Sequence, residues 1–332
     1  MSKIKIGFYC NANNIEGLGH FYRSFRLSNS INIYKSYEII FFGNFNDIAL
    51  KELNESNLQV FDIIDFNELK FKIEFIDYIF IDSYIKTQHQ IDDICDLTKC
   101  IFIDDFNSQD YSRAYAILNF TIDAIKLDYP KNIIKYIGTK FLPVKKEFVN
   151  IRKKNLKNKK FIKTNDNLTI LFFFSGSNLD LDTLKKIISI FDTAFFKCKF
   201  IWLINKEITG LDLKNNTLCI IQRALNIENL YDISDIVVSG GGMVKYECGF
   251  CGIQNFAIST NELQYKETLQ FKNYFLTNEL GMIKSISDNQ IETKLNNLIL
   301  DSNSQYNFYE NSNSFFSNQK NYLYQHLKMI LI

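Results

Sequence analysis

The sequence is short of several features that would direct it to particular partners. Lysine and arginine total 38 against 37 aspartate and glutamate, so no overall field attracts nucleic acid or an anionic membrane. No run reaches the roughly 18 to 20 apolar residues of a transmembrane helix. We therefore expect no nucleic-acid partner and no stable membrane insertion. A bound anion must then be held locally, by backbone N–H groups or single side chains.

Cysteine usage excludes a disulfide framework. The seven cysteines are odd in number and scattered, and several, such as Cys10 and Cys219, lie in apolar runs. This pattern is typical of reduced thiols. The first ten residues also lack the apolar segment of a signal peptide, so we expect a cytoplasmic protein, as a monomer or weak dimer. Cys248 and Cys251 are spaced like half of a metal or redox motif, but we interpret them as buried packing residues because no second pair exists. We expect no metal and no cofactor.

Short apolar runs alternate with helical patterns in both halves of the chain. The strand-like runs cover residues 3–10, 37–42, 58–64, 78–81, 100–103, 114–120, 168–174, 200–204, 218–222, 236–239 and 255–259. Parallel neighbours need a crossover, so the alternation predicts two α/β domains with parallel sheets. The expected divisions are an N-terminal domain (1–150), a basic linker (151–166), a C-terminal domain (167–304) and a C-terminal helix (305–332). Ligands of such sheets bind beyond the carboxyl ends of the strands.

The loop 17–20 is the first candidate site, because it leaves the first strand and opens a helix. Gly17 and Gly19 allow a tight turn and close approach to a ligand. His20 would lie at the helix N-terminus, where the neutral, basic form of the ring is favoured. Arg23, one turn later, would face a phosphate or brace the loop. A dinucleotide loop is disfavoured because Tyr22 occupies the third glycine position, and the remaining alternative is a loop that only caps a helix.

A run of glycines after the strand 236–239 is the second candidate. The predicted phosphate cradle consists of Gly240, Gly241, Gly242 and Met243, at the start of a helix whose N–H groups would bind an anion. It is not a Walker A loop, since no Gly-Lys-Ser/Thr follows. Glu247, one turn later, can accept two hydroxyls of a ribose; alternatively it is an ordinary solvated helix residue.

Polar residues follow other strands. The amides of Asn261 and Gln264 could bind a sugar, although Asn261 could equally cap a helix. Ser175 and Gly176 form a smaller loop of the same kind.

Aspartates end two strands of the first half. They occur in Asp82-Ser83-Tyr84 and Asp104-Asp105. We expect them to position a sugar or a water, or else to cap helices.

Together these motifs resemble the UDP-2,4-diacetamido-2,4,6-trideoxy-β-L-altropyranose hydrolases of pseudaminic acid biosynthesis. The resemblance covers most of residues 3–285 and rests on Gly17-x-Gly19-His20-x-x-Arg23, the two aspartate motifs, a Ser-Gly strand end, the glycine run with Glu247, and Asn261 with Gln264. It implies a GT-B fold, shared with MurG-like glycosyltransferases, in which two Rossmann-like domains face each other across a cleft. The N-terminal domain would carry catalysis and the C-terminal domain would bind UDP.

The resemblance also implies a reaction. His20 would be the base that activates water, with Tyr84 near the sugar and Asp82 as a further catalytic candidate. Water would attack the anomeric carbon, the C–O bond would break, and UDP would leave with inversion. Glu247, Asn261 and Gln264 would contact nucleotide and sugar.

Three departures from the family pattern bear on the sugar more than on the reaction class. Ser83 stands where the family often has histidine, Gly242 where it often has serine or threonine, and two residues separate Asn261 from Gln264. The main alternative is a GT-B glycosyltransferase that passes a sugar, such as a nonulosonic acid, to a glycan acceptor. A nucleotide-sugar-binding protein without catalysis is the third, and His20 argues against it.

Overall fold

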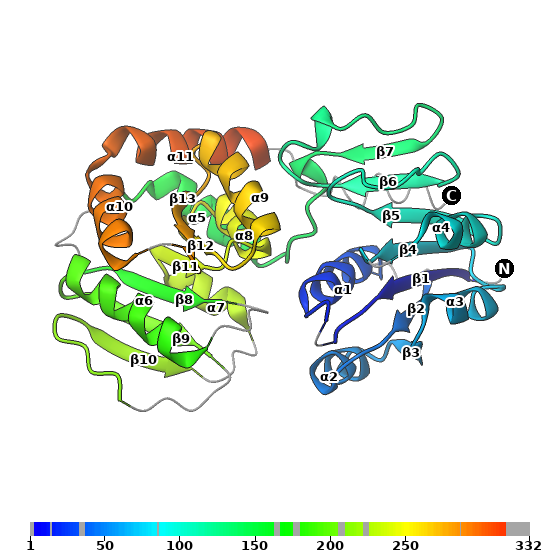
Figure 1. Ribbon diagram of the computed structural model, residues 1–332, viewed down its shortest axis with the longest axis horizontal. Coiled ribbons are helices and arrows are strands. Elements are labelled where there is room, and N and C mark those ends of the chain that lie inside the picture. Colours follow the sequence, from blue (N-terminus) through cyan, green and yellow to red (C-terminus); the bar gives the residue numbers. More distant parts are fainter. Residues whose placement is uncertain are drawn as a thin grey trace. The chain divides into compact units, whose positions relative to one another are not determined.

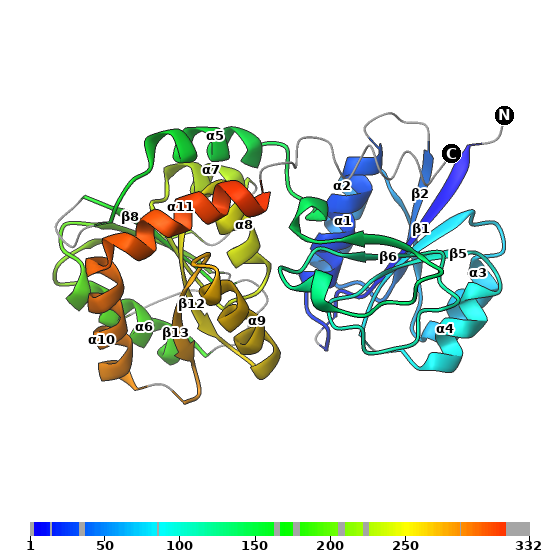
Figure 2. The same ribbon diagram turned by 90° about the horizontal axis from the view of Figure 1, so that it is seen from above.

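A computed structural model describes residues 3–13, 15–32, 37–84, 86–162, 167–174, 180–204, 210–221, 226–285 and 287–316. The chain forms two compact units that meet in the sequence between Pro143 and Val144. Each contains one parallel sheet with helices on both faces (Figures 1 and 2). The predicted α/β class is therefore confirmed. No described helix is long and apolar enough to cross a membrane.

The first unit is built on a seven-stranded sheet of order β3-β2-β1-β4-β5-β6-β7. Its strands are β1 (Ile4–Cys10), β2 (Tyr37–Gly43), β3 (Gln59–Asp62), β4 (Tyr78–Asp82), β5 (Lys99–Ile103), β6 (Ala116–Asn119) and β7 (Ile134–Ile137). Its helices are α1 (Gly19–Asn32), α2 (Asp47–Glu55), α3 (Phe66–Lys72) and α4 (Gln88–Cys95), with 3₁₀ turns η1 (Ala124–Lys126) and η2 (Thr139–Phe141). Figure 2 shows α1 and α2 on one face of the sheet and α3 and α4 on the other.

The strand order of this sheet reverses between β1 and β4. After β1 the chain adds β2 and β3 on one side of that strand, and it then adds β4 to β7 on the other side. The neighbours β1 and β4 are therefore the point where the direction of the strand order changes. Such switch points leave a crevice at the carboxyl ends of the strands. Cys10 pairs in register with Asp82, so the two strands end level. All five residues of β4 are buried, as expected for a central parallel strand covered on both faces.

The second unit is built on a six-stranded sheet of order β10-β9-β8-β11-β12-β13. Its strands are β8 (Thr169–Phe173), β9 (Lys199–Leu203), β10 (Thr217–Ile221), β11 (Ile236–Ser239), β12 (Gln254–Ser259) and β13 (Asn278–Met282). Its helices are α5 (Phe148–Asn158), α6 (Leu181–Ala194), α7 (Ile227–Ile233), α8 (Met243–Cys251), α9 (Glu262–Asn273), α10 (Asp288–Leu300) and α11 (Ser302–Phe316). The apolar stripe of α6 packs into the core of this unit.

The basic segment expected to be a linker is instead helical up to Asn158. Its lysines form the outer face of α5, while Phe148 and Ile151 are buried. Arg152 is also buried, and it donates to the backbone oxygens of Phe250 (2.7 Å) and Ser312 (3.1 Å). These bonds tie α5 to the end of α8 and to α11. Of the C-terminal helix expected over 305–332, the structure describes residues up to 316, within α11.

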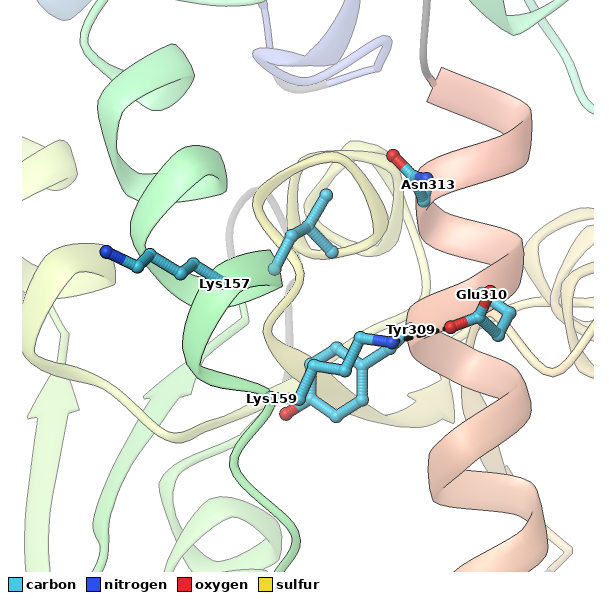
Figure 3. Close-up of a pocket in the computed structure, with 6 residues that line it drawn as sticks. Lys157, Lys159, Tyr309, Glu310 and Asn313 are labelled. Atoms are coloured by element: carbon cyan, nitrogen blue, oxygen red, sulfur yellow. Dashed lines mark hydrogen bonds and ion pairs between the residues drawn. The ribbon is translucent and has the colours of Figure 1, made fainter.

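A small hollow lies between α5 and α11 (Figure 3). Its lining residues are Leu156, Lys157, Lys159, Tyr309, Glu310 and Asn313. The Lys159 ammonium donates a hydrogen bond to Glu310 Oε1 at 2.6 Å. None of the predicted site residues lines this hollow, so the candidate chemistry lies elsewhere.

Candidate active site

The glycine loop of the first unit follows β1 and opens α1, as predicted. Gly17 has φ 70° and its N–H donates to Asn13 O at 2.8 Å, a left-handed turn that favours glycine. A β-carbon at Gly19 would meet no atom within 4 Å. Only the first of the two glycines is therefore required by the turn.

His20 forms a pair with Asp82 at the switch point. Its Nδ1 lies 2.6 Å from Asp82 Oδ1, although 62 residues separate them. Burial opposes ionisation of Asp82, but the charges of Arg23 and His20 hold the pKa of this carboxyl well below its ordinary value. An ionised carboxylate only accepts hydrogen bonds, so Nδ1 carries the proton. In the neutral ring, Nε2 is then the basic nitrogen.

Arg23 joins two carboxylates beneath His20. Its Nε donates to Asp82 Oδ2 at 2.6 Å, and Nη1 donates to both oxygens of Asp105 at 2.8 and 3.0 Å. The residue is 5% exposed. The guanidinium is thus buried and its donors are taken up by the two carboxylates, and the expected contact of Arg23 with a phosphate stays a prediction.

Tyr84 lies beside His20, and its expected place near a sugar stays a prediction. The two rings meet edge to face with centroids 4.5 Å apart, and the tyrosine is 43% exposed. Its hydroxyl donates to Asp105. Desolvation and the Asp105 charge raise the pKa of Tyr84 well above its ordinary value. The hydroxyl is therefore protonated at neutral pH.

Two of the aspartates, Asp82 and Asp104, are held by protein groups, and their expected role in positioning a sugar or a water stays a prediction. Asp82 is fully buried and its oxygens are held by His20 and Arg23. Asp104 is also buried, accepting from Tyr111 Oη (2.8 Å) and the backbone N–H of Asn107 (2.6 Å). Neither caps a helix, and Asp104 supports the loop after β5.

Sequence reasoning missed Glu16, which fixes the glycine loop. Ser83 Oγ donates to its Oε2 at 3.0 Å, and the Asn11 amide donates to its Oε1. Ser83 therefore joins the β4 end to the loop. No sequence motif indicates the contact between Ser83 and Glu16, because the two residues follow different strands and are far apart in the sequence. Asp105 was noticed in the sequence, but its bonds to Arg23 and Tyr84 were not.

The glycine run of the second unit joins β11 to α8. Gly241 has φ 83°, and a β-carbon there would lie 2.7 Å from Thr268 Oγ1 and 3.1 Å from Ser259 Oγ. No side chain caps α8 at Gly242. The first N–H groups of a helix need a partner from outside it, and an anion can supply one.

Glu247 lies in α8 but is 2% exposed, and Tyr231 Oη donates to its Oε2 at 2.6 Å. The alternative that it is an ordinary solvated helix residue is therefore wrong. Its contact with a ribose stays a prediction.

The two amides after β12 differ in their surroundings. Asn261 caps α9, accepting from Gln264 N at 3.0 Å, which is the alternative considered for it. The Gln264 side chain accepts from Thr260 Oγ1 at 2.6 Å, and its Nε2 lies 3.7 Å from where a β-carbon of Gly242 would be. Gln264 thus lies beside the glycine run.

Ser175 and Gly176 lie outside the described residues. Cys248 and Cys251 are fully buried, and burial raises the pKa of both thiols well above the ordinary value, which confirms the packing interpretation. Within the described ranges, no cluster of three His, Cys, Asp or Glu side chains is arranged to hold a metal ion.

Comparison with known proteins shows the fold. No protein-family model matches the chain. An uncharacterized protein of Methanocaldococcus jannaschii is 26% identical over 280 residues, which are 79% of this chain and 57% of that protein; the match thus spans little more than half of its length. The structure of Arabidopsis thaliana UGT89C1 with UDP-L-rhamnose superposes with a TM-score of 0.68 at 11% identity, covering 100% of this chain and 99% of that one. Acinetobacter baumannii MurG superposes at 0.67 and 9% identity, covering 99% of each. The chain has the GT-B fold of MurG-like proteins.

Proposed function

We propose that the chain is an enzyme acting on nucleotide sugars, and that it hydrolyses a UDP-linked 2,4-diacetamido-2,4,6-trideoxy hexose. The pair formed by His20 and the ionised Asp82 carries this proposal. It supplies an imidazole whose Nδ1 is held by a buried carboxylate, at the carboxyl ends of the strands, where ligands of such sheets bind. Such a pair is suited to general-base catalysis.

In the proposed step, Nε2 of His20 takes a proton from a water molecule. The water oxygen bonds to the anomeric carbon as the bond from that carbon to the diphosphate oxygen breaks. UDP leaves with the electron pair of that bond, and the sugar is released with inverted configuration. Asp82 stabilises the imidazolium that forms, and Arg23 keeps Asp82 ionised.

The diphosphate would be bound by the glycine run. Gly240, Gly241 and Gly242 lead into Met243, whose N–H is the first of an α8 terminus that lacks a side-chain cap. The contacts of Glu247, Asn261 and Gln264 with the nucleotide and sugar are part of the same proposal. The choice of sugar is supported by the motif resemblance.

The second candidate is a glycosyltransferase, since the same imidazole could take the proton of an acceptor hydroxyl. The similarity in fold to MurG and to UGT89C1 bound to UDP-L-rhamnose favours it.

The two reactions differ in their need for an acceptor. The purified chain would be incubated with the UDP-sugar alone, while NMR follows UDP and the free sugar. Hydrolysis predicts equal amounts of both products without additive. UDP that appears only after a glycan or lipid acceptor is added would overturn the hydrolase proposal in favour of transfer, and no UDP in either case would overturn both.

A further inference from the structure

A buried lysine lies beneath the glycine run of the second unit. Lys245 is in the first turn of α8 and is 0% exposed. Its Nζ lies 2.6 Å from Glu267 Oε2 on α9, donates to the carbonyl oxygen of Gly241, and lies 3.5 Å from that of Gly242. A charged side chain is buried only where it is paired, so this environment is specific to an ammonium.

These three contacts use the whole ammonium group. Lysine has three N–H donors and no acceptor, and the three oxygens around Nζ match that number. A P-loop lysine reaches its phosphates directly, but Lys245 has neither exposure nor a remaining hydrogen for an anion. It therefore cannot be a phosphate ligand, despite its place beside the glycines.

The contacts do fix the direction of two peptide groups. In a planar trans peptide, the C=O and the following N–H point in opposite directions. The Gly241 carbonyl points to the buried ammonium, so the N–H of Gly242 points away from it. The Gly242 carbonyl oxygen also lies near the ammonium, so the N–H of Met243 in the same peptide group points away from it. The positive φ of Gly241 and its tight fit against Thr268 hold the turn from the other side.

We propose that Lys245 is a positioning residue that aims the N–H groups of Gly242 and Met243 at the diphosphate of a bound nucleoside diphosphate. This inference rests on the proposed function. Glu267 holds the ammonium in place and is itself held by Tyr246 Oη at 2.5 Å. The chain thus uses its buried cation to shape the cradle, while backbone groups make the contacts with the anion.

The test uses variants that separate this role from folding. Lys245→Met removes the brace but leaves Glu267 unpaired, so Lys245→Met/Glu267→Gln removes both charges together and keeps an acceptor for Tyr246. Lys266→Met is the matched control, because Lys266 is an exposed lysine of α9. Calorimetric titration with UDP and with uridine, together with thermal unfolding, is applied to each variant and to the wild type.

The double variant is expected to bind UDP at least about tenfold more weakly, since hydrogen bonds to a charged group are misaligned. Uridine affinity should stay within about twofold, because the diphosphate contacts alone are affected. Lys266→Met should bind both as the wild type does. Unchanged UDP affinity in the double variant overturns the brace, and so does an equal weakening for UDP and uridine, which indicates a general effect on the fold. A wild-type chain that does not bind UDP overturns the proposed function and with it the cradle.

Discussion

His20 Nδ1 donates to the buried, ionised carboxylate of Asp82 at 2.6 Å. The contact joins the first turn of α1 to the end of β4. It determines which ring nitrogen holds the proton, and it leaves Nε2 as the group that can accept one from a nucleophile.

Removing the imidazole should abolish most turnover without affecting nucleotide binding. His20→Ala is expected to lower kcat roughly 10²- to 10⁴-fold, which is the usual contribution of a general base. UDP affinity, measured by calorimetry, should be unchanged because the diphosphate cradle that we propose lies in the second unit. A variant that retains wild-type kcat would exclude His20 as the base.

The ion pair of Asp82 should stabilise the fold in a pH-dependent manner. The folded pKa of Asp82 is lowered, so its contribution is fully present above the unfolded value of about 3.9 and is lost as pH falls toward the folded pKa. The free energy of unfolding of the wild type should therefore exceed that of Asp82→Asn at pH 7, and the difference should shrink between about pH 4 and 2. Urea unfolding at several pH values measures it. A difference that does not change over this range contradicts the assignment.

The buried guanidinium should matter far more to stability than an exposed one. Arg23→Met leaves Asp82 and Asp105 without their shared cation and should cost about 3–5 kcal/mol in the free energy of unfolding. Arg113→Met is the matched control, because Arg113 pairs with Asp96 at the surface and should cost less than about 1 kcal/mol. Equal losses in urea unfolding would show that Arg23 is not the brace described.

The glycines of the two loops should respond differently to a methyl group. Gly241→Ala places a β-carbon against Thr268 in a left-handed backbone and should destabilise the chain by at least about 1–3 kcal/mol. Gly19→Ala meets open space at the start of α1 and should stabilise the chain by about 0.4–1 kcal/mol, because alanine restricts the unfolded chain. Thermal unfolding of both variants checks this, and a neutral Gly241→Ala would contradict the packing of the glycine run.

The sequence allowed the central strands and their loops to be predicted, because buried parallel strands are short and apolar. The edge strand β7 and the polar β13 were missed: two residues of β7 are exposed, and β13 contains Asn278, Glu279 and Gly281. β7 has only four residues, Ile134–Ile137, and β13 lacks the apolar pattern that indicates a strand.

The contacts within the site could not be predicted from local pattern. Arg23, Asp82 and Asp105 meet only because the sheet order places β4 and β5 next to β1. Charged residues are mostly solvated, so the burial of Lys245 and Glu247 had no signal in the sequence. Both depend on how α8 packs within its unit.

Hydrolysis of the UDP-sugar in water enriched in ¹⁸O tests the proposed role of His20 most directly. If His20 activates water for attack at the anomeric carbon, the label must appear in the free sugar while the released UDP stays unlabelled, as mass spectrometry of both products would show. Label in the β-phosphate of UDP would mean that the P–O bond breaks, and would contradict the mechanism proposed for the His20–Asp82 pair.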